Sequence, residues 1–246
     1  SSNEINDGIV RRIERNSNCL LDNLNDTQIV EHRIDSLIMN IGLFYFQDLS
    51  YLEKSVEYFV KFYQMRERMF GDGDSDDVAK FLLNIGVSYS KLGQHDKALD
   101  YHLKAYEMRR RLIGGEASDD NEDIAWSLFN IGLSYERLGK YKQALEFNLK
   151  AHEMRMRLFN DQDHENLTHS LYNIGVCYSR LNQHEKAIEQ FLKSYEMRKR
   201  LFGETSDPQH PLIGLSLNGI IFSFKKLKNI ENINKYNKIL NSIFKT

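Results

Sequence analysis

An internal repeat constrains the fold of this chain more than any other feature of its sequence. The tripeptide Asn-Ile-Gly begins at Asn40, Asn84, Asn130 and Asn173, at intervals of 44, 46 and 43 residues. In each copy a tyrosine lies five residues after the asparagine, and each unit ends in a Met-Arg-x-Arg run. Because a repeat of about 20–50 residues is typical of a solenoid, the whole chain is expected to form one repetitive array.

The spacing of apolar and small residues inside a unit predicts two helices. In the second unit such residues recur at helical intervals on both sides of a turn at Leu92-Gly93. They are Leu82, Ile85, Gly86 and Tyr89 before the turn, and Ala98, Tyr101, Ala105 and Met108 after it. Each unit is therefore expected to be two antiparallel amphipathic helices, crossing closely where a glycine is followed twelve residues later by an alanine.

This pattern of glycine, tyrosine, turn glycine and alanine resembles the tetratricopeptide repeat. In the third unit it is carried by Ala125, Leu128, Gly132, Tyr135, Gly139, Tyr141, Ala144 and Ala151. The period exceeds that family's usual length of about 34 residues, and the acidic linkers and Met-Arg-x-Arg endings are similar to the long repeat of kinesin light chains. The resemblance implies an all-α fold, a right-handed α-α superhelical solenoid of about five helix pairs plus an N-terminal capping helix.

We expect residues 1–246 to form a single solenoid domain. Its parts are a capping helix over 4–25, repeats over 27–70, 76–113, 121–159 and 164–202, and a degenerate C-terminal capping repeat over 209–245. In that last unit we align Asn218 with the repeated asparagine. This alignment puts Ile220 and Ser223 in place of the glycine and tyrosine.

Composition narrows the class of protein. A formal net charge of −2 argues against general affinity for nucleic acid, and the sequence has no apolar run of about eighteen residues that could span a membrane. Cys19 and Cys177 lie on different predicted helices, so we interpret them as thiols of a reduced, cytoplasmic protein.

The motifs that suggest chemistry do not have the required spacing. His164 and His169 are five residues apart, one too many for a zinc-protease helix. Asp72, Asp74 and Asp76 resemble the start of a calcium loop that lacks the glycine and glutamate of its sixth and twelfth positions. The sequence also lacks a phosphate-binding glycine loop and a nucleophile elbow. We therefore expect no enzyme activity, no metal and no cofactor.

The resemblance implies that the first helix of each unit lines a concave groove that receives a peptide. First-helix residues outside the core form one stripe at i, i+4, i+7 and i+11. Unit by unit they are Ser36, Asn40, Leu43, Gln47; Lys80, Asn84, Val87, Lys91; Trp126, Asn130, Leu133, Arg137; His169, Asn173, Val176, Arg180; and Gly214, Asn218, Ile221, Lys225. Peptide contact is expected from all of these in the second to fourth units, and from Asn40, Asn218 and Lys225 in the outer two.

Two members of the stripe have alternative interpretations. The asparagine that recurs in all five units could bond a peptide backbone through its donor and acceptor, or bond a neighbouring helix and set the stacking of repeats. Trp126, the only tryptophan, could anchor a ligand or pack between repeats.

A column of basic residues follows the far ends of the first helices. It comprises Lys91, Arg137, Arg180 and Lys225, and Lys80 adds to it. Because the chain as a whole is slightly acidic, this column predicts a polarised groove and a partner that carries carboxylates or a phosphate. Kinesin light chains bind acidic peptides in such a groove, so the resemblance points the same way. For the arginine pairs that end each unit, we favour a role in helix-dipole compensation and solubility over binding.

The sequence thus predicts a non-catalytic module, adaptor or scaffold that binds an acidic peptide or a partner's tail. The alternative is a sensor or regulatory domain of a larger enzyme whose catalytic part is not in this chain. Self-association through Ile221, Phe222, Ile239 and Phe244 is a further option, although capping explains these residues equally well.

Overall fold

The computed structural model describes residues 52–70, 74–114, 120–203 and 210–244, and every regular element in these ranges is a helix. The helices are α3 (Leu52–Phe70), α4 (Asp76–Lys91), α5 (His95–Leu112), α6 (Glu122–Arg137), α7 (Tyr141–Leu158), α8 (Glu165–Arg180), α9 (His184–Arg198), α10 (Pro211–Lys226) and α11 (Ile230–Ile243). A π-helical turn, Lys199–Gly203, extends α9. The predicted all-α fold is confirmed.

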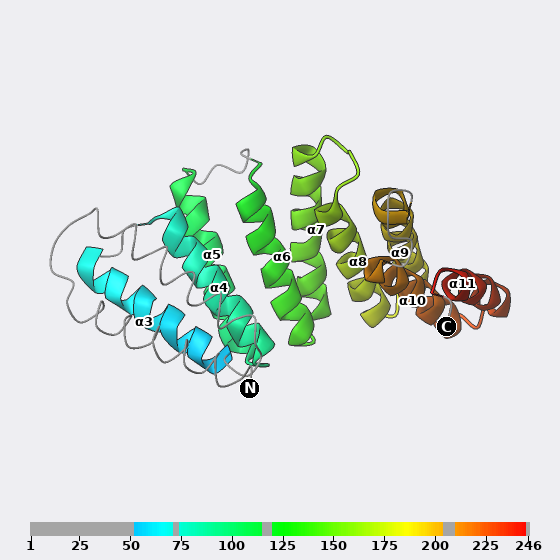
Figure 1. Cartoon of the computed structure of the whole chain (residues 1–246), viewed down its shortest axis with the longest axis horizontal. Coiled ribbons are helices and arrows are strands. Elements are labelled where there is room, and N and C mark those ends of the chain that lie inside the picture. Colours follow the sequence, from blue (N-terminus) through cyan, green and yellow to red (C-terminus); the bar gives the residue numbers. More distant parts are fainter. Residues whose placement is uncertain (1–51, 71–73, 115–119, 204–209, 245–246) are drawn as a thin grey trace, which may run out of the picture.

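The helices pack in consecutive pairs. Helix α4 packs with α5, α6 with α7, α8 with α9 and α10 with α11, and each pair packs on the next. The array runs from α3 at one end to α11 at the other (Figure 1). Neighbouring first helices also contact one another, α4 with α6, α6 with α8 and α8 with α10. The predicted solenoid is therefore present, and its first helices lie side by side along one face.

Some expectations fall outside the described residues. These are the capping helix over 4–25, the first helix of the repeat over 27–70, the thiol of Cys19, and the first-unit stripe of Ser36, Asn40, Leu43 and Gln47.

The linkers provide the caps that start the first helices. The Ser75 hydroxyl accepts a hydrogen bond from the Val78 amide at 3.2 Å, and the Asn121 side chain accepts from the amides of Asp123 and Ile124. The His164 ring accepts likewise at the start of α8. These caps satisfy amide groups that a helix leaves unpaired at its N-terminus.

Glycine permits the close crossing of the two helices in a pair. A Cβ atom on Gly132 would lie 2.7 Å from Asn148 Oδ1, and one on Gly175 would lie 2.7 Å from Phe191 Cδ1. Gly86 faces the His102 ring in the same way. The alanines expected at the crossing, Ala98, Ala144 and Ala187, are fully buried. The side chain sixteen residues after each glycine therefore fills the space that the glycine leaves open.

The alignment of the fifth unit was wrong by one residue. Helix α8 starts at Glu165 and α10 at Pro211, so equivalent residues are 46 apart rather than 45. Phe224, stacked on Tyr236 with ring centroids 5.7 Å apart, therefore takes the place of the repeated tyrosine. Gly219 is equivalent to the repeated asparagine, and Ile221 to the glycine. An asparagine, Asn218, stands one residue before the equivalent position, and it concealed this shift in the sequence.

Within the described residues, no helix is long and apolar enough to cross a membrane. Cys177 is a buried, free cysteine, and burial raises the pKa of its thiol to about 12. A thiol with this pKa stays protonated and unreactive at neutral pH.

Candidate functional site

The candidate site is the row of residues that follows the first helices, called the inner stripe below. In the structural alignment it comprises Lys80, Asn84, Val87 and Lys91 on α4; Trp126, Asn130, Leu133 and Arg137 on α6; His169, Asn173, Val176 and Arg180 on α8; and Leu215, Gly219, Phe222 and Lys226 on α10. On α10 this set replaces the expected Gly214, Asn218, Ile221 and Lys225, of which Gly214 and Ile221 are buried. Successive first helices are in contact, and the stripe positions recur at the same register on each of them.

Each first helix ends in a basic residue. Lys91, Arg137, Arg180 and Lys226 are the last residues of α4, α6, α8 and α10, and all four are exposed. A cation in the last turn interacts favourably with the helix dipole, so this placement also stabilises the helices. Each of the four described first helices thus has one exposed positive charge at its C-terminal end.

A half-buried carboxylate lies among these cations. Burial raises the pKa of Glu136, whereas the charges of Arg137 and Arg180 act to lower it. Glu136 of α6 is thus influenced by its neighbour Arg137 and by Arg180 of α8. Sequence reasoning did not single out Glu136, because the equivalent residues are Ser90, Ser179 and Lys225 and no repeated pattern marks the position.

The repeated asparagines are recessed. Asn130 and Asn173 are 5% and 8% exposed, and Asn84 is half-buried. Asn130 Nδ2 donates to the carbonyl oxygen of Trp126 one turn earlier, at 2.8 Å, so one N–H of its amide is used inside α6. This bond is neither of the two roles expected from the sequence. Peptide contact by these asparagines stays a prediction.

Trp126 packs between repeats. Its indole lies against the apolar cluster of α4 and α5 and against that of α6 and α7. The ring stacks on Phe129, with centroids 5.5 Å apart, and the Arg155 guanidinium lies 5.6 Å from its centroid. The packing role that the sequence left open is therefore present, and contact with a ligand stays a prediction.

Lys80 and His169, the first stripe residues of α4 and α8, each have an acidic neighbour. Lys80 Nζ lies 2.6 Å from Asp76 Oδ2, and this bond raises the pKa of Lys80. His169 Nε2 lies 3.7 Å from Glu165 Oε1, and burial, followed by the charge of Arg198, lowers the pKa of His169. The starts of these helices are thus less positive than their ends.

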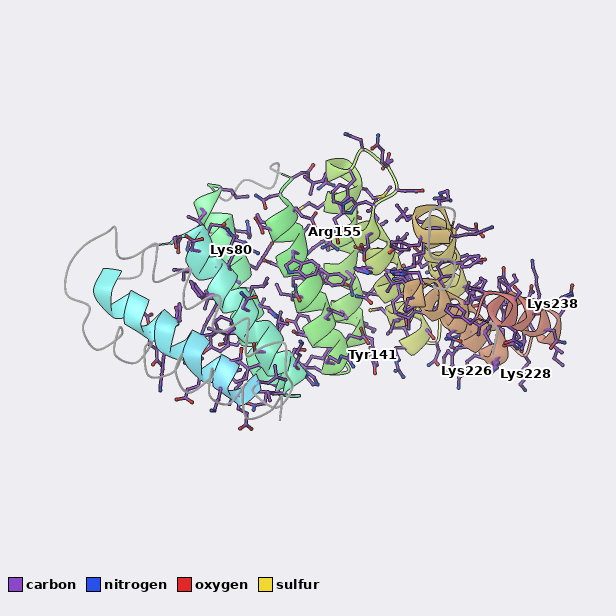
Figure 2. The ribbon with its side chains drawn as sticks, in the orientation of Figure 1. Lys80, Tyr141, Arg155, Lys226, Lys228 and Lys238 are labelled. Atoms are coloured by element: carbon purple, nitrogen blue, oxygen red, sulfur yellow. The ribbon has the colours of Figure 1, made fainter. Side chains whose placement is uncertain are left out.

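Sequence reasoning misread the first arginine of each Met-Arg-x-Arg run. Arg109, Arg155 and Arg198 are 3%, 0% and 1% exposed, and Arg155 lies in the interior of the array (Figure 2). Each donates to a serine hydroxyl and a backbone carbonyl of the following first helix. The acceptors are Ser127 Oγ and Asp123 O for Arg109, Ser170 Oγ and Asn166 O for Arg155, and Ser216 Oγ and Leu212 O for Arg198, at 2.7–3.3 Å.

The expected solubility role is therefore wrong for these three arginines, although each lies in the last turn of its helix, where a cation interacts favourably with the dipole. They join consecutive helix pairs from inside the core, where hydrogen bonds offset the cost of burying a cation. Among the described residues, Arg109 Nε and Arg155 Nη2 have no hydrogen-bond partner. A signal was available in the sequence, because Ser127, Ser170 and Ser216 recur within first helices at positions that otherwise suit apolar residues.

The second arginine of each run is exposed and pairs with an aspartate of its own unit. Arg111, Arg157 and Arg200 contact Asp74, Asp120 and Asp163, with nitrogen–oxygen distances of 2.6–3.0 Å and a separation of 37 residues in each pair. Each pair joins the C-terminal end of a unit's second helix to the linker before its first helix. Exposed pairs of this kind contribute only about 0–1 kcal/mol.

In the described ranges, no group of three or more histidine, cysteine, aspartate or glutamate side chains is placed to hold a metal ion. His164 lies before α8, accepts from the Asn166 amide at 3.1 Å and stacks on Phe159. His169 lies within α8. The two histidines thus have separate structural surroundings.

Comparison with known proteins identifies one family. The tetratricopeptide repeat model matches residues 34–111 and 123–200. No curated protein is similar enough in sequence to count as a match.

Several solved structures share the architecture. BtubC (BKLC) from P. vanneervenii superimposes with a TM-score of 0.75 at 14% identity, covering 96% of this chain and 88% of that one. A putative kinesin light chain from Podosopora anserina gives 0.66 at 11% identity, with 85% and 92% covered. A Rap protein complexed with competence and sporulation factor gives 0.61 at 13% identity, with 96% and 70% covered. At these identities the likeness concerns the fold alone.

Proposed function

Because this chain belongs to the tetratricopeptide-repeat family, whose solenoids serve as protein-interaction scaffolds, we propose that its inner stripe binds an extended acidic segment of a partner protein. The observation that carries the proposal is the placement of Lys91, Arg137, Arg180 and Lys226. Four exposed cations, one per unit, end four first helices that lie side by side.

Arg137 and Arg180 form the centre of the proposed site. They end two first helices that are in contact, and both lower the pKa of Glu136 through their charge, so we place the ligand's acidic residues beside them. Arginine binds carboxylates through two parallel hydrogen bonds, which fixes the ligand's orientation as well as its charge. Glu136 restricts the choice of ligand, because its own negative charge disfavours a second acidic group placed directly over it.

The geometry sets the spacing of the ligand's acidic residues. Packed helices lie about 8–10 Å apart, and an extended chain advances about 3.3 Å per residue. Successive cations of the column would therefore meet acidic side chains about three residues apart. One turn before the cation on each of α4, α6 and α8, the half-buried Val87, Leu133 and Val176 would contact apolar residues of the segment.

The test uses two labelled peptides of identical composition. One carries glutamates at every third position between apolar and small residues, and the other has the same glutamates in one block. Fluorescence anisotropy should show that the wild-type chain binds the spaced peptide more tightly, with affinity falling as salt is raised. The double variant Arg137→Glu, Arg180→Glu should weaken binding by at least about tenfold.

A matched variant controls for a general change of charge. Lys140→Glu, Lys142→Glu alters two exposed lysines at the start of α7, outside the inner stripe, and should leave the affinity unchanged. Circular dichroism would check that both variants remain helical. Equal losses in the two double variants, or equal binding of the two peptides, would show that the inner stripe is not the binding site.

A further inference from the structure

The C-terminal end of the array exposes a group of large apolar side chains. Phe222, Leu227 and Ile230 are 49%, 37% and 71% exposed. They come from the last turn of α10, the turn after it and the first residue of α11. Together with Lys225, Lys226 and Lys228 they are called the terminal patch below; Phe222 and Lys226 are also the last members of the inner stripe.

The same three positions are less exposed wherever another helix pair follows. Their equivalents in the fourth unit are Val176 and Leu181, which are half-buried, and His184, which is 9% exposed. In the third unit the equivalents Leu133, Leu138 and Tyr141 are also half-buried. In the described part of the chain no helix pair follows α11. The terminal patch is thus the surface on which a further helix would stack.

Lysines surround this apolar surface. Residues 211–244 contain five lysines and a single acidic residue, Glu231, although the whole chain has a net charge of −2. Lys226 Nζ lies 5.5 Å from the centre of the Phe222 ring. Lys226, Lys228 and Lys238 gather at the C-terminal end of the array (Figure 2). The patch therefore combines exposed apolar area with a strong local positive charge.

From these features we infer that the terminal patch docks an amphipathic helix of a partner protein, with acidic residues flanking its apolar face. The apolar face would cover Phe222, Leu227 and Ile230 as a following helix covers their equivalents, and the acidic flanks would pair with the lysines. A second copy of this chain, docked through the same patch, would bring two sets of lysines together. Like charges in a desolvated interface disfavour that arrangement.

The probe is a labelled amphipathic peptide of about 18 residues, built from leucine, alanine and glutamate. A matched peptide carries lysine in place of every glutamate. The acidic peptide binds the intact chain in an anisotropy titration, and the basic peptide binds at least about tenfold more weakly. Phe222→Ser, Ile230→Ser reduces the affinity for the acidic peptide by about tenfold or more, and so does Lys226→Glu, Lys228→Glu.

Two controls separate the patch from other surfaces. Leu112→Ser removes an apolar side chain of comparable exposure, 42%, at the end of α5, and leaves the affinity unchanged. Lys140→Glu, Lys142→Glu alters two exposed lysines outside both the patch and the inner stripe, and also leaves it unchanged. Loss of binding in Arg137→Glu, Arg180→Glu, with normal binding by the patch variants, would mean that the peptide binds the inner stripe and would overturn the inference.

Three further outcomes would also overturn it. The first is failure of the acidic peptide to bind. The second is patch-dependent self-association in sedimentation velocity, which would make a second copy the occupant. The third is patch-dependent binding to phosphatidylserine vesicles without binding to the peptide, which would make a lipid surface the occupant.

Discussion

A single buried histidine shows how one position of the repeat accepts different chemistry in different units. His102 faces Gly86, and its Nδ1 lies 2.9 Å from Ser134 Oγ. Among the described residues, its Nε2 atom is buried without a hydrogen-bond partner. Burial lowers the pKa of His102 to about 4. The equivalent residue of the next unit is Asn148, whose amide side chain does not become protonated in this pH range.

The stability of the chain should therefore fall in mild acid. A free histidine has a pKa of about 6.5, so between about pH 6.5 and 4 the unfolded chain binds a proton at residue 102 that the folded chain excludes. The stabilisation is complete above that range and is lost as the pH falls through it. Urea unfolding should show a loss of roughly 1–2 kcal/mol from His102 between pH 7.5 and 5.

His102→Asn, which copies the next unit, should remove that part of the dependence. Some dependence should remain, because burial also lowers the pKa of His152 to about 4. If the variant lost as much stability as the wild type over this range, His102 would not be its source. Restricting the comparison to pH 5 and above limits the contribution of carboxylates, whose usual pKa values lie near 4.

At the scale of the element, the turn between the two helices of a pair always needs one left-handed residue. The position is held by Gly93 and Gly139, with φ of 75° and 72°, then by Asn182 at 58° and Lys228 at 55°. Glycine adopts this conformation freely, asparagine tolerates it, and a long side chain is strained in it. The last turn thus has the least suitable residue of the four.

Lys228→Gly should therefore stabilise the C-terminal helix pair. The gain expected at 25 °C is up to about 1 kcal/mol, reduced by the greater freedom of glycine in the unfolded chain. Asn182→Gly should change stability by a few tenths of a kcal/mol at most. Chemical denaturation of both variants beside the wild type would measure this. A larger gain from Asn182→Gly than from Lys228→Gly would contradict the explanation.

Helix pairs and their order were predictable because they depend on local patterns, such as the run from Leu82 to Met108. Features that depend on contacts between units could not be predicted from the sequence. Arg155 looks like a surface residue in its own helix, and its burial follows from acceptors on the next one. The register of the last unit was missed because Asn218 mimics the repeated asparagine one residue early. Glu136 was missed because only tertiary proximity to Arg180 distinguishes it.

At the scale of the whole molecule, buried arginines link each pair to the next. A solenoid has only neighbour contacts, so its cooperativity depends on the strength of each junction. Arg155→Met keeps much of the side-chain volume but leaves Ser170 Oγ and the Asn166 carbonyl without this donor. We expect a loss of about 2–4 kcal/mol and earlier unfolding of the part from α8 onward.

Hydrogen exchange would locate the weakened junction. Protection should fall first in α8 to α11 of Arg155→Met, whereas α4 to α6 keep theirs. Arg157→Met is the matched control two residues away, because it removes only the exposed pair with Asp120 and should change stability by about 0–1 kcal/mol. Uniform loss of protection along the array would mean that the junction does not limit cooperativity.

The acceptors that all three buried arginines share are a backbone carbonyl and a serine hydroxyl of the next first helix, and neither belongs to the inner stripe. The arginine junctions and the cations proposed to bind a partner are therefore separate sets of residues. Helix pairs that keep the arginine and the serine can be duplicated, deleted or exchanged, and stripe residues can be rewritten, without altering the bond that joins one pair to the next. Such an array can acquire new partners through recombination as readily as through point mutation.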